Sequence, residues 1–202
     1  MIVIGLCGAS GSGKGYVCEA FKKHGVEFID TDKVYSTKIV RAGSDCLGEL
    51  CMFFGKGILN EDGSLNRRAL SERVFQGENA SEHLKVLNRI THRYILADVE
   101  KTIDEYRKNG ARAVIVDAPV LFESGFNESC DTTICVTASY DTKLERIIAR
   151  DKISREKAQA RLKSQLPDER LVELCEYEIK NDADHDIEAQ VLSIIEKLNL
   201  GE

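Results

Sequence analysis

The sequence predicts a three-layer α/β/α fold built on a five-stranded parallel sheet. Short apolar runs alternate with helical segments, and this alternation places helices on both faces of a parallel sheet. Two stretches break the alternation because they carry helical signals and no convincing strand, so we expect them to be helical insertions. The expected strands are residues 2–7, 26–29, 111–118, 132–137 and 177–179.

The chain has 202 residues, which suffices for one domain with small excursions. The expected organisation is a single core made of residues 1–31, 110–149 and 175–202, with a helical insertion over about 32–109 and a lid over about 150–170. A turn at residues 60–63 should interrupt the insertion. Within the lid, Pro167 should restart a helix at its first turn.

Composition excludes several classes of protein. The formal net charge of −6 argues against general binding of nucleic acid, and no apolar run approaches the roughly 20 residues that cross a bilayer. The seven cysteines are scattered, and the pairs Cys46/Cys51 and Cys130/Cys135 lack zinc spacing. We therefore expect free, buried thiols in a reducing cytoplasm.

A glycine-rich segment, Gly8 to Lys14, joins the first strand to a helix expected over residues 14–24. Its spacing matches the Walker A motif of P-loop nucleotide-binding proteins. Glycines let the backbone wrap an anion with its N–H groups pointing inward, and the lysine reaches the β and γ oxygens. A glycine-rich turn that binds nothing would need neither this spacing nor the lysine. The predicted ATP-binding residues of this segment are Gly8, Gly11, Ser12, Gly13, Lys14, Gly15 and Tyr16.

The motif departs from its usual form at one position. A Ser or Thr normally follows the lysine and places its hydroxyl on Mg²⁺, whereas this chain has Gly15. We expect no metal ligand from the P-loop side chain, which leaves Asp32 or Asp117, acting through water, together with the phosphates. A nucleotide-binding protein without catalytic activity is therefore an alternative.

Carboxylates stand at the ends of two expected strands, where ligands gather in open α/β sheets. Asp30 and Asp32 follow the second strand, and Asp117 ends the third. A carboxylate there can orient and deprotonate an acceptor hydroxyl, and Asp117 also resembles a Walker B carboxylate. One of Asp30 and Asp32 is expected to be only a helix N-cap, and which one stays open.

Arginines gather around the second insertion. Arg146 and Arg150 are four residues apart on an expected helix, so they share a face and can balance the charge of a transferred phosphoryl group. Arg155 and Arg161 follow in the lid and have two interpretations. They either close over ATP or pair with carboxylates in solvent.

The motifs, taken in their order along the sequence, resemble those of the dephospho-CoA kinase family over nearly the whole chain. The most particular ones are Leu65-Asn-Arg-Arg68 and Asp117-Ala-Pro-Val-Leu-Phe-Glu123, with Phe28-Ile-Asp-Thr-Asp32 and Ile179-Lys-Asn-Asp182 on either side. The resemblance implies ATP-dependent phosphorylation of the ribose 3′-hydroxyl of dephospho-CoA, which gives CoA, with Mg²⁺ as cofactor. Another P-loop kinase for nucleosides or nucleotides is the second hypothesis.

The resemblance also implies a role for individual residues. Asp32 is the expected general base, Lys14 holds the phosphates, Arg146 and Arg150 act from the lid, and Asn181 lies near the adenine. The expected partners are a small molecule only, without nucleic acid or membrane, in a monomer or weak homo-oligomer. Arg93 replaces the proline that usually follows His92, and His92 itself is either a substrate contact or a packed helix residue. The expected acceptor-binding residues are Asp32, Arg67, His92, Asp117, Pro119, Leu121 and Glu123.

Overall fold

The computed structural model describes residues 1–201, and the chain divides into two compact units. We call Met1–Ile29 together with the chain from Glu105 onward the core unit, and Asp30–Asp104 the helical unit. Each unit is described by itself. Within residues 1–201, no helix is both long and apolar enough to cross a membrane.

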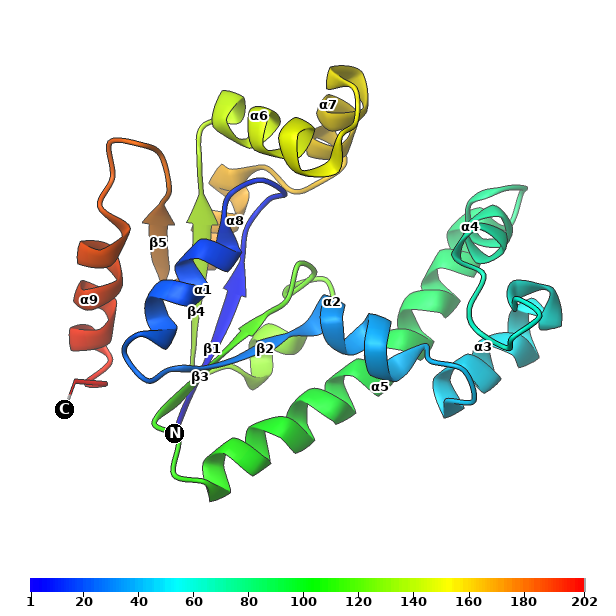
Figure 1. Ribbon diagram of the computed structural model, residues 1–202, viewed down its shortest axis with the longest axis horizontal. Coiled ribbons are helices and arrows are strands. Elements are labelled where there is room, and N and C mark those ends of the chain that lie inside the picture. The colour runs from blue at the N-terminus through cyan, green and yellow to red at the C-terminus, as the bar shows by residue number, and fades with distance from the viewer. Residues whose placement is uncertain (202) are drawn as a thin grey trace. The chain divides into compact units, whose positions relative to one another are not determined.

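The sheet has five strands in the order β2-β3-β1-β4-β5 (Figure 1). β1 pairs in parallel with β3 on one side and β4 on the other, and β4 pairs in parallel with β5. The predicted fold class is therefore confirmed. The bounds are β1 Ile2–Cys7, β2 Glu27–Asp30, β3 Ala113–Asp117, β4 Thr132–Thr137 and β5 Tyr177–Lys180.

Helices cover both faces of this sheet. In Figure 1, α1 (Lys14–Lys22) lies in front of the strands, α9 (Ile187–Lys197) lies beside β5, and α8 (Asp168–Leu174) lies behind β4. α1 and α9 share one layer, since both contribute to the same core cluster. Alternate residues of each strand face opposite layers, so Ile4, Leu6 and Val136 join the core under α1 and α9. The intervening residues, which include Cys7 and Cys135, face the layer of α8.

The first helix is shorter than predicted. It ends at Lys22 rather than His24 because the chain turns through Gly25, whose φ is +75°. Val26 N–H donates to Phe21 O at 3.4 Å, which satisfies a carbonyl at the helix end in the manner of a Schellman motif. The glycine that signals the end of a helix lies beyond the last helical turn, which accounts for the difference.

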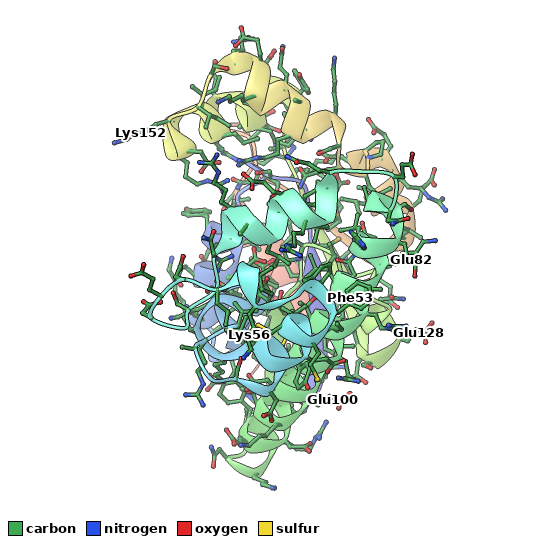
Figure 2. The ribbon with its side chains drawn as sticks, turned by 90° about the vertical axis from the view of Figure 1, so that its right-hand side faces the viewer. Phe53, Lys56, Glu82, Glu100, Glu128 and Lys152 are labelled. Carbon is green, nitrogen blue, oxygen red and sulfur yellow. The ribbon has the colours of Figure 1, made fainter. Side chains whose placement is uncertain are left out.

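The segment after β4 forms a helical pair with a small core of its own. α6 (Tyr140–Asp151) and α7 (Arg155–Lys163) enclose Leu144, Ile147 and Ala158, all fully buried. Lys152 makes the corner between them in the left-handed conformation, and Figure 2 shows its side chain pointing away from the ribbon. Pro167 is the N-cap of α8, one position before the helix, and not a residue of its first turn as predicted.

The helical unit consists of helices, with one short pairing that the sequence did not predict. Leu59 and Leu65 form an antiparallel bridge across the turn at residues 60–63. Phe53, labelled in Figure 2, packs edge-to-face on Phe54 and His83. The bounds are α2 Thr31–Val34, the π-helical turn η1 Tyr35–Ile39, α3 Asp45–Phe54, the 3₁₀ turn η2 Lys56–Ile58, α4 Arg67–Phe75 and α5 Ala80–Lys108; a second 3₁₀ turn, η3 Phe126–Ser129, belongs to the core unit.

Candidate active site

The glycine-rich segment forms a tight loop between β1 and α1. Gly11 and Gly13 have φ of +81° and +91°, where other residues are strained. A Cβ on Gly11 would lie 2.5 Å from Lys143 O on α6, and a Cβ on Gly13 would lie 2.0 Å from Asn181 Nδ2. These glycines therefore have two roles: they shape an anion-binding loop, and they leave room for α6 and Asn181 to approach it.

Lys14 is the first residue of α1, and its ammonium turns back over the loop. Its Nζ donates to Gly8 O at 3.0 Å, so the charge stands where the loop N–H groups and the helix N-terminus already favour an anion. Ser12 is fully buried and its hydroxyl oxygen has no partner among the described residues. Gly15 and Tyr16 are exposed on the first turn of α1.

Arg146 lies on α6 and contacts the loop directly. One guanidinium nitrogen, Nη1, donates to Gly11 O and Ser12 O, each at 3.3 Å, and Nη2 donates to Asn181 O at 3.0 Å. Asn181 Nδ2 donates to Ser12 O at 2.8 Å from the other side. The structure thus brings Arg146, Asn181 and the loop together, although they lie far apart in the sequence.

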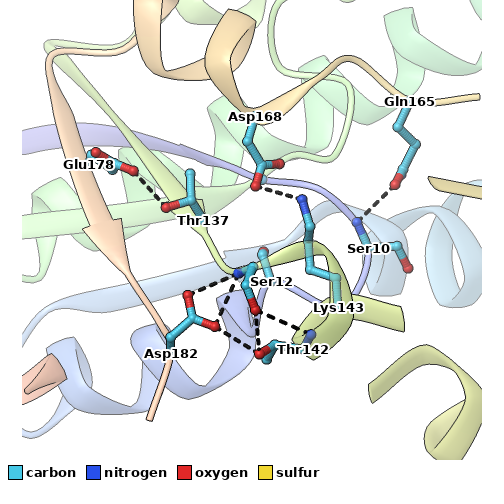
Figure 3. Close-up of polar contacts among 12 residues, drawn as sticks. Ser10, Ser12, Thr137, Thr142, Lys143, Gln165, Asp168, Glu178 and Asp182 are labelled. Atoms are coloured by element: carbon cyan, nitrogen blue, oxygen red, sulfur yellow. Dashed lines mark hydrogen bonds and ion pairs between the residues drawn. The ribbon is translucent and has the colours of Figure 1, made fainter. Parts of the chain in front are cut away.

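Asp182 links the segment after β5 to the start of α6. It accepts hydrogen bonds from Ser139 N, at 2.9 and 3.1 Å, and from Thr142 Oγ1 at 2.8 Å (Figure 3). These bonds, with Thr142 contributing most, lower the pKa of Asp182. Asp182 therefore orients the helix that carries Arg146. Asp182 belongs to the motif Ile179-Lys-Asn-Asp182, but its role was not predicted, because a carboxylate that accepts from the start of a distant helix has no local signal in the sequence.

Two arginines, Arg150 and Arg161, share the carboxylate of Asp151. Arg150 Nε donates to Asp151 Oδ1 at 2.7 Å, and Arg161 also pairs with Asp151. These two arginines, with Arg150 dominant, lower the pKa of Asp151 to about 2. Arg150 reaches the loop as well, since its Nη2 donates to Ser10 Oγ at 3.3 Å. Arg161 therefore pairs with a carboxylate, which was the second of the two interpretations of this residue.

Two further contacts hold the lid segment and α8 near the loop, and the sequence predicted neither. Gln165 Oε1 accepts from Ser10 N at 2.9 Å, and Lys143 Nζ pairs with Asp168 Oδ2 at 2.6 Å (Figure 3). The Lys143 and Asp168 side chains are only 10% and 17% exposed, so removing one partner would leave a poorly solvated charge. A pocket of about 400 Å³ lies beside this pair.

The run that begins at Asp117 follows the end of β3. Asp117 is paired in register with Leu6 on β1. Burial and the Asp117 carboxylate raise the pKa of the Cys18 thiol, whereas Lys14 lowers it, so both charged groups lie near Cys18 on α1. Pro119 and Glu123 are exposed. Leu121 is fully buried against Gly5, so the structure places it beneath the turn and not on a surface that a substrate could touch.

The helical unit separates the roles of two neighbouring carboxylates. Asp30 accepts from Lys33 N at 2.9 Å and is the N-cap of α2. Asp32 lies within the first turn of that helix and is not its cap. The sequence left open which of the two aspartates caps the helix, and the structure shows that it is Asp30.

The remaining acceptor-side candidates lie on α4 and α5. Arg67 is exposed, with its guanidinium 5.6 Å from the centre of the Tyr35 ring, and Arg68 forms an ion pair with Glu72 on the same helix. His92 lies in the middle of α5, which continues through Arg93 without a turn. Arg93 pairs with Glu49 on α3, so it supplies a packing contact within the helical unit.

A phosphate-binding loop lies at the carboxyl end of a parallel sheet, and two arginines of α6, Arg146 and Arg150, contact this loop. This arrangement is that of a P-loop phosphotransferase. The chain belongs to the dephospho-CoA kinase family, since the sequence model of that family matches residues 2–186. This finding confirms the family that the motifs indicated.

Individual relatives agree with the family match. A dephospho-CoA kinase of Bacillus thuringiensis subsp. konkukian (strain 97-27) is 34% identical over 200 residues, which is 98% of each chain. The solved dephospho-CoA kinase of Campylobacter jejuni has a TM-score of 0.69 at 28% identity and covers 97% of this chain and 96% of its own. A solved Thermus thermophilus protein reaches a TM-score of 0.82 at 26% identity, with the same coverage.

Proposed function

We propose that this chain transfers the γ-phosphoryl group of ATP to the ribose 3′-hydroxyl of dephospho-CoA, which gives ADP and CoA and completes CoA synthesis. The observation that carries the proposal is the family match over residues 2–186, which includes the intact loop from Gly8 to Lys14. In the reaction, the hydroxyl oxygen bonds to the γ phosphorus while the bond to the β–γ bridging oxygen breaks.

The residues have the following proposed roles. The loop N–H groups and Lys14 bind the β and γ phosphates, and Arg146 and Arg150 balance charge on the transferred group. Asp32 accepts the proton of the acceptor hydroxyl. Asn181 positions the segment beside the adenine. Arg67, His92, Asp117, Pro119 and Glu123 contribute to acceptor binding, and Leu121 supports that site from within the core.

The acceptor assay tests this function. Mg-ATP is incubated with dephospho-CoA, adenosine 5′-monophosphate or no acceptor, and the products are identified by mass. We expect CoA and ADP to appear in equal amounts with dephospho-CoA alone. Turnover only with the monophosphate would favour another nucleotide kinase. ATP binding without turnover of either acceptor would favour a nucleotide-binding protein without activity.

Mg²⁺ is the proposed companion of ATP, but the loop does not fit its usual coordination. A Cβ on Gly15 would have no atom within 4 Å, so the position that normally carries the hydroxyl ligand is open space beside the loop. We propose that the carboxylate of Asp117, which lies near Cys18 on α1, contacts Mg²⁺ through a water molecule. Bound Mg²⁺ would neutralise charge on the phosphates.

Replacing Gly15 by serine is expected to strengthen metal binding and so to lower the Mg²⁺ concentration that activity requires. The added side chain meets no atom within 4 Å, and Gly15 has no positive φ, so the substitution fits the helix without strain. We expect half-maximal activity at a lower Mg²⁺ concentration, and stronger binding of Mn²⁺ in the presence of ATP, measured by electron paramagnetic resonance.

The matched control is Gly15→Ala, which gives the same relief of backbone entropy but no hydroxyl. Both variants should gain a few tenths of a kcal/mol of stability or more over glycine, up to about 1 kcal/mol for alanine. If the alanine and serine variants showed the same metal dependence, the side chain at this position would have no part in metal binding.

Substitution of Asp182 by alanine is expected to weaken ATP binding and to destabilise the protein. Three hydrogen bonds to the start of α6 would be lost, so the helix carrying Arg146 would no longer be held against the loop. We expect the KM for ATP to rise several-fold and the stability to fall by roughly 1 kcal/mol. Steady-state kinetics and denaturant unfolding measure the two effects.

The pH dependence provides a second readout for Asp182. Because its folded pKa is lowered, its contribution to stability is present above the unfolded pKa and is lost as the pH falls through the folded pKa. The stability difference between the wild type and Asp182→Ala should therefore shrink on acidification. Asp184→Ala is the control, since the Asp184 side chain is 79% exposed and its one ion pair within residues 1–201 is with its neighbour His185.

We propose a monomer or weak homo-oligomer in the cytoplasm. All seven cysteines are free thiols, which suits a reducing compartment. Size-exclusion chromatography with light scattering over a range of concentrations measures the oligomeric state.

A further inference from the structure

Three of the seven cysteines meet on the sheet face that α8 covers. Cys7 is the last residue of β1 and directly precedes Gly8, and Cys135 is its register partner on β4. Cys175 follows the end of α8, and its sulfur lies 3.5 Å from the sulfur of Cys7. No metal-binding group of three or more His, Cys, Asp or Glu side chains exists within residues 1–201.

The three thiols are not equivalent. Cys7 and Cys135 are buried, with 1% and 0% exposure, whereas Cys175 is partly exposed. Hydrogen bonds from Cys135 and Cys7 lower the pKa of Cys175, although burial works in the opposite direction. The hydrogen bond with Cys135 raises the pKa of Cys7, and the one with Cys175 raises the pKa of Cys135. Of the three thiols, Cys175 therefore loses its proton most readily, and it is also the one that solvent can reach.

We propose that Cys175 is a peroxide-reactive modification site and that Cys7 converts the oxidised form into a Cys7–Cys175 disulfide. The Cys175 thiolate attacks one oxygen of hydrogen peroxide, the O–O bond breaks, and hydroxide leaves. The Cys7 sulfur then attacks the sulfenic sulfur, the S–S bond forms, and the S–O bond breaks. The Cys7 proton leaves with the oxygen as water, and the hydroxide from the first step takes up the proton that Cys175 released when it became a thiolate. Two thiols and one peroxide thus give one disulfide and two waters.

Such a bond would act on the phosphate loop. A disulfide has a length of about 2.05 Å, so two sulfurs that now lie 3.5 Å apart must move together. Cys7 is bonded to Gly8, and Gly8 has little room, since a Cβ there would lie 2.3 Å from Val136 O. Any shift of Cys7 is therefore transmitted to the loop, and we infer that the oxidised chain binds ATP more weakly.

Peptide mapping separates the possible bonds. Trypsin places Cys7 in residues 1–14, Cys175 in 171–180, and Cys130 and Cys135 together in 113–143, so a Cys7–Cys175 disulfide gives a cross-linked pair that differs from any link to Cys130 or Cys135. After treatment with hydrogen peroxide we expect residues 1–14 joined to 171–180, reversed by dithiothreitol. Cys175 should react about tenfold faster than Cys51, a partly exposed thiol on α3.

Variants keep the proposal falsifiable if one of them fails to fold. In Cys7→Ala, the sulfenic acid of Cys175 should accumulate and be trapped by dimedone. Cys175→Ser should abolish both products, whereas Cys51→Ser should leave them unchanged. A link from Cys175 to residues 113–143, or oxidation of Cys175 no faster than Cys51, would overturn the assignment.

The coupling to the loop has its own measurement, which does not depend on the acceptor or on turnover. The Kd of a fluorescent ATP analogue is compared for the reduced and oxidised chains, with Cys175→Ser treated in parallel. We expect a several-fold rise in Kd on oxidation of the wild type and no rise in the variant. A disulfide that formed without changing Kd would refute the coupling.

Discussion

Replacing Lys14 by methionine is expected to lower kcat by about 10²–10³-fold, the usual loss when one donor to a developing charge is removed. Lys14 stands at the start of α1 with its ammonium returned over the loop to Gly8 O at 3.0 Å. Methionine retains the length and the helix propensity of lysine but carries no charge. Single-turnover kinetics with saturating ATP would separate the loss in chemistry from weaker binding.

Lys23→Met is the matched control for this variant. Lys23 directly follows α1, its side chain is 68% exposed, and its only ionic contact among the described residues is with Glu188 at 3.6 Å. The same change of side chain there should leave turnover intact and alter stability only slightly. A loss for Lys14→Met no greater than for Lys23→Met would contradict the assignment of Lys14 to the phosphates.

Replacing Asp32 by asparagine is expected to lower kcat by about 10²–10⁴-fold, which is the usual contribution of a general base. Asparagine has the same shape as aspartate but cannot accept the proton of the acceptor hydroxyl. Because Asp32 is not part of the loop that binds the phosphates, the variant should still bind ATP with nearly unchanged affinity. The assay of CoA formation, together with calorimetry of ATP binding, measures the two quantities.

Asp30→Asn is the control, since it makes the identical substitution two residues earlier. Asp30 caps α2 through Lys33 N, and asparagine is as good an N-cap as aspartate. We therefore expect Asp30→Asn to keep both its stability and its activity. If instead Asp30→Asn lost turnover while Asp32→Asn kept it, the base would have been assigned to the wrong carboxylate.

Local patterns in the sequence predicted most of the fold. The apolar runs identified all five strands, and β4 has the predicted bounds, 132–137. The errors lie at boundaries, where the helix before Gly25 ended early and Pro167 proved to be a cap. The bridge between Leu59 and Leu65 was missed because two residues in a turn carry no periodic signal.

The site divides in the same way between local and distant information. The loop, Lys14 and Arg146 were predicted because spacing and charge are visible along the chain. Gln165 and Asp182 were not, because each contacts a segment that lies far away in the sequence. Leu121 was expected at the acceptor, but its position in the core depends on the packing of β1 beneath it.

Local patterns along the chain were enough to predict a phosphate loop between a buried strand and a helix, and the ordered motifs indicated the family. The structure was needed to show that Gly11 and Gly13 also make room for α6 and Asn181, and that Cys7 and Cys175 meet beside the loop. The physical reason is the range of the interactions. Backbone propensity and periodicity act between neighbours, whereas close packing joins residues that the chain separates by more than a hundred positions.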